Sequence, residues 1–226
     1  MKKSTLLIFC FFLFSCDFKS AVDYFDEARK LEDAEMYQEA NLLLDRAIKK
    51  WPDYRPAIYN RAVNKSALGY YREAINDYYQ ILKFNPRNAR VILNIGNNYK
   101  RLNQFEKSLI AYEKLIKERM LNDSDTLVIY YGNRYLDDDS FYLVSDLELK
   151  YELAITYLRL DKVMEAKELF EYLITENYLA FSSKSFLGEC YLKLKKTKKA
   201  CELFLESAKN NVIESKALYK QFCYKE

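Results

Sequence analysis

A spacing of 34 residues recurs along this chain and constrains its fold more than any other feature. In a frame that begins at residue 21, small side chains occupy the eighth and twentieth positions of five units: Ala28/Ala40, Ala62/Ala74, Gly96/Ser108, Ala154/Ala166 and Gly188/Ala200. Bulky side chains occupy the twenty-fourth position: Leu44, Tyr78, Tyr112, Phe170 and Phe204. Small residues beside bulky ones let two antiparallel helices cross closely. The repeat therefore predicts a stack of helix-turn-helix units.

The frame divides the chain into segments. Units one to three cover 21–122 (21–54, 55–88 and 89–122), an insertion covers 123–146, and units four and five cover 147–214 (147–180 and 181–214). Only four glycines and three prolines occur in 226 residues, so the sequence has few of the breakers that a β-rich fold would show. Ser20 with Asp23, and Ser145 with Glu148, have the spacing of capping boxes and predict helix starts. Residues 215–226 are expected to form an amphipathic helix that covers the last unit.

The pattern of small and bulky positions resembles that of tetratricopeptide-repeat (TPR) proteins, over about 195 residues of the chain. The resemblance implies an all-α fold, a right-handed superhelical solenoid of antiparallel helix pairs. It also implies a protein that binds other proteins. Lys65 and Met120 depart from the family pattern, and we expect their units to be less sharply defined.

The first residues form a separate segment. Lys2 and Lys3 precede an apolar run, 6–14, that is too short to cross a bilayer and has the form of a secretory signal, predicted to cover 1–15. Leu13-Phe14-Ser15-Cys16 resembles the lipobox of bacterial lipoproteins, which implies that Cys16 is the lipidated mature N-terminus. An ordinary secretory signal or an uncleaved anchor is the alternative.

A lipidated Cys16 would place the protein in the cell envelope, anchored to a bacterial membrane and facing the periplasm. Several acyl chains hold a protein on a membrane much more firmly than one does. The tether, 16–20, is short: fully extended, the residues between the cysteine and the first helix span roughly 10 to 15 Å. We therefore expect the solenoid to lie close to the membrane surface.

Composition argues against catalysis and against nucleic-acid binding. The chain has no histidine, which removes Ser-His and Cys-His nucleophile pairs and most zinc sites. Without Lys2 and Lys3 it carries 34 basic and 33 acidic residues, too balanced for general nucleic-acid binding. We expect no enzyme activity, no metal site and no cofactor other than the covalent lipid on Cys16.

Three further cysteines, Cys190, Cys201 and Cys223, show no metal-ligand spacing. Cys190 and Cys201 fall on the two expected helices of unit five, so one alternative is a disulfide between them. The favoured alternative is that the cysteines are small buried apolar residues.

The insertion, 123–146, is both aromatic and acidic, and the repeat does not explain it. It contains Leu127-Val128-Ile129-Tyr130-Tyr131 and Asp137-Asp138-Asp139. It is either a contact element specific for a partner or a degenerate helical hairpin that keeps the stack continuous. The second is slightly favoured.

In the TPR family, the first helix of each unit lines a concave groove through a fixed set of positions. Transferred to units two and three, these positions predict a peptide-binding groove formed by Tyr59, Asn60, Arg90, Asn94, Asn97, Lys100 and Arg101. Asparagine amides can hold an extended backbone and arginines can bind a carboxylate. The groove therefore suits a peptide segment with an acidic group; ordinary surface polarity explains the same residues equally well.

These features favour a membrane-anchored TPR lipoprotein that acts as an interaction scaffold for other envelope proteins or their peptide segments. One alternative is the TPR subunit of the outer-membrane β-barrel assembly machinery, which the architecture resembles without a diagnostic motif. A more distant alternative is an envelope enzyme or an enzyme accessory.

Overall fold

The structure is a computed structural model that describes residues 18–121 and 144–224. Within these two ranges it contains eleven α-helices and no strand, which confirms the predicted all-helical fold. The helices are α1 (Ala21–Asp33), α2 (Tyr37–Lys50), α3 (Arg55–Ala67), α4 (Tyr71–Phe84), α5 (Ala89–Arg101), α6 (Phe105–Leu121), α7 (Asp146–Arg159), α8 (Val163–Thr175), α9 (Ala180–Lys193), α10 (Thr197–Lys209) and α11 (Ile213–Phe222).

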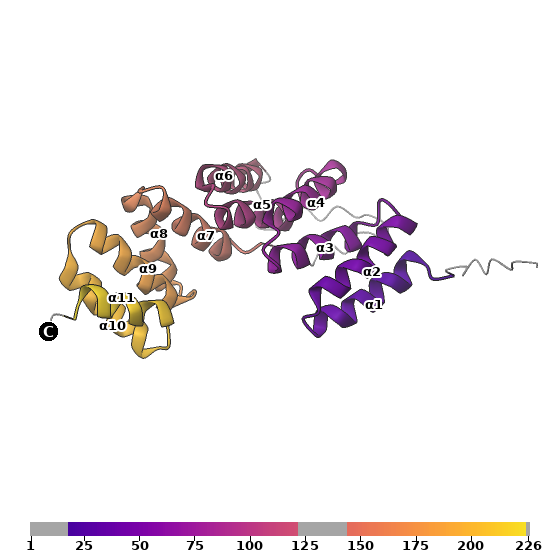
Figure 1. Cartoon of the computed structure of the whole chain (residues 1–226). Helices are drawn as coiled ribbons and strands as arrows, with labels where there is room; N and C mark the ends of the chain where they lie inside the picture. Colours follow the sequence, from indigo (N-terminus) through magenta and orange to yellow (C-terminus); the bar gives the residue numbers. More distant parts are fainter. Residues whose placement is uncertain (1–17, 122–143, 225–226) are drawn as a thin grey trace, which may run out of the picture.

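Successive helices pack against one another in chain order, and the resulting stack curves into an arch (Figure 1). Helices α5, α7 and α9 lie toward the inside of the arch, whereas α4, α6 and α8 lie along its outside (Figure 1). The core consequently runs along the stack as a series of hydrophobic clusters. This is the packing expected of repeats that each contact only their neighbours.

The small residues of the repeat are buried where the two helices of a pair cross. Gly96 shows why: a β-carbon added there would lie 2.3 Å from Cε1 of Tyr112, a fully buried ring. Gly188 has the same relation to Phe204, at 2.6 Å. The bulky ring at position 24 thus occupies the space that a side chain at position 8 would need, as the sequence pattern predicts.

Helix starts use the predicted serines in two ways. Ser20 forms a complete capping box with Asp23: the Asp23 amide donates to the Ser20 hydroxyl (3.1 Å) and the Ser20 amide donates to the Asp23 carboxylate (2.8 Å). These hydrogen bonds lower the pKa of Asp23. Ser145 caps α7 by accepting from the Glu148 amide (3.0 Å), but the Glu148 carboxylate is directed to Arg90 on α5. The second motif therefore serves both as a cap and as a link between units.

The turn inside each unit has one repeated geometry. Its fifteenth position has a positive φ in all five units, at Glu35 (57°), Gly69 (83°), Asn103 (56°), Asp161 (60°) and Lys195 (58°). The next residue donates its amide to the carbonyl of position 11, at 2.8 to 2.9 Å, as in the Gln104 to Tyr99 bond. A left-handed residue followed by such a bond ends a helix and reverses the chain.

The core continues past the insertion. Val144, Leu149 and Leu153 belong to the same buried cluster as Leu93 and Tyr112. The third and fourth units therefore share one hydrophobic core. The other residues of the insertion, 123–143, lie outside the described residues, so its two alternatives remain as predicted.

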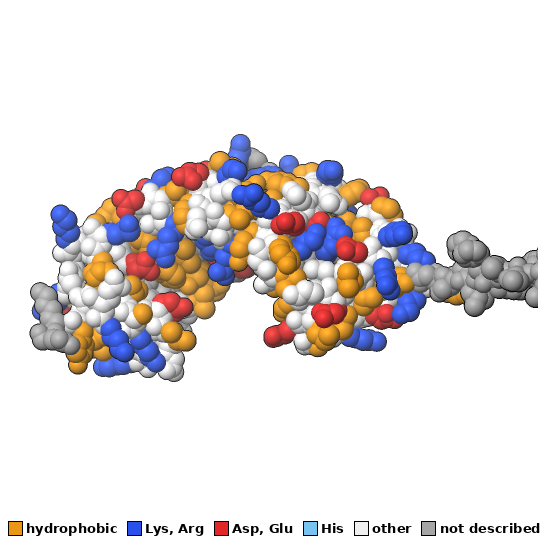
Figure 2. All heavy atoms as spheres, in the orientation of Figure 1, with side chains coloured by type: hydrophobic (Ala, Val, Ile, Leu, Met, Phe, Trp, Pro, Cys, Tyr) orange, Lys and Arg blue, Asp and Glu red, His pale blue; other side chains and the backbone are white. Residues whose placement is uncertain are grey.

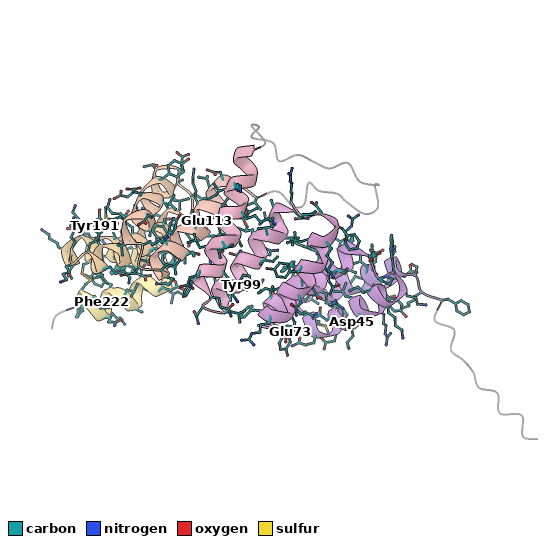
Figure 3. The ribbon with its side chains drawn as sticks, turned by 90° about the horizontal axis from the view of Figure 1, so that it is seen from above. Asp45, Glu73, Tyr99, Glu113, Tyr191 and Phe222 are labelled. Atoms are coloured by element: carbon teal, nitrogen blue, oxygen red, sulfur yellow. A yellow bond between two sulfur atoms is a disulfide. The ribbon has the colours of Figure 1, made fainter. Side chains whose placement is uncertain are left out.

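At the C-terminus, α11 packs on α10 and covers the last unit. Figure 3 labels its last residue, Phe222, at the same end of the molecule as Tyr191 of unit five. Inside this contact the Ser215 hydroxyl donates to Ser185 on α9 (2.6 Å), and both side chains are buried.

The cysteine pairing differs from the disulfide alternative in the sequence analysis. Cys201 on α10 bonds to Cys223, which follows α11, and Cys190 is a free, fully buried thiol. The pairing with Cys190 was wrong because Cys190 belongs to the core cluster between α8 and α9, whereas α11 returns along α10 and brings Cys223 to Cys201. The expectation of small buried residues holds for Cys190 only. Burial raises the pKa of the Cys190 thiol to about 12.

The predicted signal, 1–15, and the lipid-attachment residue Cys16 lie outside the described residues. Across the helices that the structure describes, none combines the length and apolarity needed to span a bilayer.

Candidate functional site

The candidate site is the inner surface of the arch, toward which α5, α7 and α9 lie in Figure 1, together with α3, the first helix of the preceding unit. Figure 2 shows the molecule hollowed between its two limbs. All seven predicted groove residues lie on α3 or α5.

Two cations of the predicted groove, Arg90 and Lys100, are paired with carboxylates of the next unit. Arg90 binds Glu148 (2.5 Å) and Lys100 forms an ion pair with Glu152, so both pairs join α5 to α7. All four side chains are at most 28% exposed. The predicted cationic patch is thus largely neutralised by acidic residues that come from beyond the insertion.

The predicted amides take part in internal hydrogen bonds. Asn60 donates to Glu32 on α1 (2.8 Å), and Asn94 donates to the hydroxyls of Tyr59 (3.3 Å) and Tyr78 (3.2 Å). Asn97 accepts from the Tyr112 hydroxyl (2.6 Å). An asparagine side chain has two N–H donors and an acceptor oxygen, so each amide keeps capacity for a further partner.

Tyr59 and Tyr78, the two tyrosines that accept hydrogen bonds from Asn94, are kept neutral by their surroundings. Burial raises the pKa of Tyr59 and of Tyr78, and hydrogen bonds from Asn94 only partly offset that effect. The ring of Tyr59 also packs edge-on against Tyr78, with ring centroids 5.9 Å apart. Tyr59 is therefore a fixed part of the inner wall and not a free surface side chain.

Arg101 differs from the other six. It lies at the end of α5, its side chain is exposed, and among the described residues it has no hydrogen-bond or ion-pair partner. Of the predicted set, it is the one charge available to an incoming anionic group.

A second group of inner residues was missed by the sequence analysis. Tyr151 on α7 lies 6.1 Å from Tyr178 and 6.1 Å from Phe186 on α9, measured between ring centroids, and all three rings are partly buried. We call Tyr151, Tyr178 and Phe186 the aromatic platform. Aromatic rings at such distances pack favourably, and Phe186 also stacks on the fully buried ring of Phe170, with ring centroids 5.4 Å apart.

The aromatic platform is bordered by charge. Arg159 pairs with Glu189 (2.8 Å) and its guanidinium lies 5.9 Å from the centre of the Phe186 ring. At Tyr151, burial and then the negative charge of Glu152 raise the pKa of the phenol to about 12. The phenol of Tyr151 consequently stays protonated and can donate a hydrogen bond at neutral pH.

The platform could have been found from the repeat. Tyr151 occupies the fifth position of unit four, and Phe186 occupies the sixth position of unit five. Both positions belong to the set that lines the groove in the TPR family. The prediction transferred those positions to units two and three only. Tyr178 lies in the turn before α9, outside that set of positions, so the frame could not identify it.

The chemistry of this surface is that of binding. It offers partly buried rings, amides with spare capacity and Arg101, which has no partner within the described part of the chain. Through 18–121 and 144–224, no group of three or more Cys, Asp or Glu side chains is placed to hold a metal ion.

Two family profiles, both described as Tetratricopeptide repeat, match residues 151–211 and 89–119. No curated protein sequence matches the chain. The matches are confined to parts of the chain, and they include α5 and the α7 to α10 region that carries the aromatic platform.

Solved structures resemble the whole arch. MamA from Desulfovibrio magneticus RS-1 aligns over 84% of this chain and 93% of its own, with 15% identity and a TM-score of 0.66. YrrB, a TPR protein with an unusual peptide-binding site, aligns over 89% and 91%, with 15% identity and a TM-score of 0.62. PilF of Pseudomonas aeruginosa aligns over 91% and 78%, with 16% identity and a TM-score of 0.58.

At these identities the likeness concerns the fold. Together with the two profile matches, it shows that this chain contains tetratricopeptide repeats and has the fold of TPR proteins.

Proposed function

We propose that this protein is a membrane-anchored scaffold of the bacterial cell envelope that holds a peptide segment of another protein along its inner surface. The observation that carries this proposal is the aromatic platform, whose partly buried rings lie at α7 and α9, next along the stack from α3 and α5, which carry the spare amides and Arg101. Rings supply apolar contact area, and the polar groups supply direction to an extended backbone. The peptide-binding site named for YrrB is consistent with such a use of this fold.

The envelope location rests on Cys16 and on the disulfide. The lipobox-like residues 13–16 motivate the anchor. Disulfides persist in oxidising compartments such as the periplasm and are rare in the cytosol. The Cys201–Cys223 bond is therefore a second, independent support for a location outside the cytoplasm.

The binding proposal is tested by crosslinking and pull-down from native membranes with Arg101→Glu and Tyr178→Ala. Arg72→Glu is the matched control, because Arg72 is an exposed arginine on the outer helix α4. We expect both inner variants to lose partners that Arg72→Glu retains. An identical set of partners in all four proteins would reject the inner surface as the binding site.

The anchor is tested separately by detergent-phase partitioning. Cys16→Ala should move the protein to the aqueous phase, whereas Cys10→Ala, within the predicted signal, should leave it in the detergent phase. Retention of Cys16→Ala in the detergent phase would reject lipidation at Cys16.

A further inference from the structure

A pocket of about 200 Å³ lies between α4, α5 and α6. Helices α4 and α6 follow the outer side of the arch (Figure 1), so this pocket is distinct from the inner surface. We call it the outer pocket. Tyr99, which lines it, is labelled in Figure 3, where the molecule is seen from above.

The floor and walls of the outer pocket are apolar. Ile92 and Ile95 are buried at 2% and 3% exposure, while Ile110 on α6 is 65% exposed. Tyr79 on α4, across the pocket, is 46% exposed. A buried floor between exposed apolar walls is the form that accommodates an apolar group from outside.

The rim of the outer pocket is cationic. Lys107 and Lys114 both line it and lie two turns apart on α6. The Lys107 ammonium lies 5.5 Å from the centre of the Tyr99 ring, and Lys114 donates to the Pro86 carbonyl (3.3 Å). Neither ammonium has a carboxylate partner among the described residues, and no Asp or Glu lines the pocket.

Two phenols complete the rim. The hydroxyls of Tyr79 and Tyr99 lie 3.3 Å apart and share one hydrogen bond, so one hydroxyl hydrogen is left for another acceptor. Burial, together with the neighbouring Tyr79, raises the pKa of Tyr99 to about 12. The Tyr99 phenol therefore stays protonated at neutral pH, and the pair adds a donor beside the two ammonium groups.

We propose that the outer pocket binds one large apolar side chain of a partner polypeptide, in a segment where carboxylates flank that side chain. The size supports a single side chain: a 150 Å³ apolar cavity holds a benzene molecule, whereas pockets for drug-sized ligands measure about 300 to 1,000 Å³. The charge supports acidic flanks, because two cations and a phenol donor stand at the rim and no carboxylate of the described residues opposes them.

This inference goes beyond the proposed use of the inner surface and does not depend on it. A partner on the outer pocket and a peptide on the inner surface would lie on different sides of the arch. The protein could then connect two other polypeptides.

The test uses full-length protein and fluorescein-labelled peptides, with binding followed by anisotropy up to millimolar protein. The probe is Gly-Glu-Phe-Asp-Gly; the comparison peptides are Gly-Lys-Phe-Lys-Gly, which reverses the flanking charge, and Gly-Glu-Ser-Asp-Gly, which removes the ring. We expect the probe to bind at least tenfold more tightly than either comparison peptide. Equal binding of the lysine-flanked peptide, or no binding of the probe, would overturn the proposal.

Variants locate the site. Ile110→Glu and Lys107→Glu/Lys114→Glu should each weaken probe binding at least tenfold. Leu42→Glu is the matched control for the first, since Leu42 is 64% exposed on α2, and Lys198→Glu on α10 is the control for the second. Both controls should bind the probe as the unmodified protein does.

Two further results would overturn the assignment. If Arg101→Glu abolished probe binding while Ile110→Glu did not, the probe would be bound by the inner surface. If the protein bound phosphatidylglycerol vesicles through Lys107 and Lys114 but did not bind the probe, the cationic rim would serve a membrane and not a polypeptide.

Discussion

At the scale of single residues, the fold depends on positions where a side chain is missing. Gly96 and Gly188 each leave space for a fully buried ring of the partner helix. Glycine costs a helix about 1 kcal/mol relative to alanine. Its presence in α5 and α9 is explained by the rings of Tyr112 and Phe204, which could not approach so closely otherwise.

Gly96→Ala is therefore expected to destabilise the protein by about 1 to 3 kcal/mol, because the new methyl group overlaps a ring that is held by neighbours and by its bond to Asn97. Urea denaturation followed by circular dichroism measures this as a lower midpoint. Lys198→Ala, on an exposed part of α10, should change the midpoint little. A midpoint raised by Gly96→Ala would mean that helix propensity outweighs the overlap.

In the turn inside each unit, substitution to glycine is expected to stabilise the protein. Glu35 and Lys195 adopt a left-handed conformation that costs residues other than glycine about 1 to 2 kcal/mol. Glu35→Gly and Lys195→Gly should each stabilise the protein by about 0.5 to 1 kcal/mol, after the larger entropy of the unfolded glycine is counted. Gly69→Ala, at the same position of unit two, should destabilise it. Thermal denaturation of the three variants checks the signs, and a lower melting temperature for both glycine variants would contradict the expectation.

At the scale of elements, the repeat predicted the helix pairs and their buried positions, since Ala, Gly and bulky residues alternate in the same way in five units. It did not predict the turn geometry, because five different residues occupy the left-handed position, from Glu35 to Lys195. Nor did it predict the partners of Arg90 and Lys100. Their carboxylates, Glu148 and Glu152, follow the insertion, and only the packing of α7 on α5 brings them close.

The repeat also did not predict the disulfide that ties the end of α11 to α10. Cys223 lies after the fifth unit, so no position in the frame indicated that it would reach Cys201. The structure explains the pairing by the return of α11 along α10. The disulfide that holds α11 on α10 should therefore stabilise the folded protein.

Reduction of the Cys201–Cys223 bond should destabilise the protein by about 3 kcal/mol, because the bond closes a loop with a sequence separation of 22. Chemical denaturation with and without a reductant such as tris(2-carboxyethyl)phosphine measures the difference. The double variant Cys201→Ser/Cys223→Ser is the control and should not respond to the reductant. An equal response of both proteins would show that the bond is absent in solution.

At the scale of the whole molecule, the hydrophobic clusters along the stack hold buried and partly buried groups whose neutral form is favoured. The pKa of Cys190 rises from 9.0 to about 12, and that of Tyr151 rises from 10.0 to about 12. Each group contributes fully to folding below its unfolded pKa, and that contribution is lost as the pH rises toward the folded value. The molecule should therefore lose stability between about pH 9 and pH 12.

Melting temperatures measured from pH 8 to pH 12 check this expectation, and they should fall steadily above about pH 9. Cys190→Ala removes one of the titrating groups and should make the decline shallower. A melting temperature that is constant over this range would contradict the burial of these groups.

The two ends of the stack are closed in different ways. At one end α1 is held by the hydrogen bonds of Ser20 and Asp23 and by noncovalent packing, whereas at the other end a covalent bond ties Cys223 to α10. In a linear array, loss of structure spreads from neighbour to neighbour. Unfolding of this protein should consequently have a direction. It should begin at α1, next to the N-terminal tether, and spread from repeat to repeat along the arch. The last repeat, which the disulfide closes, should unfold last.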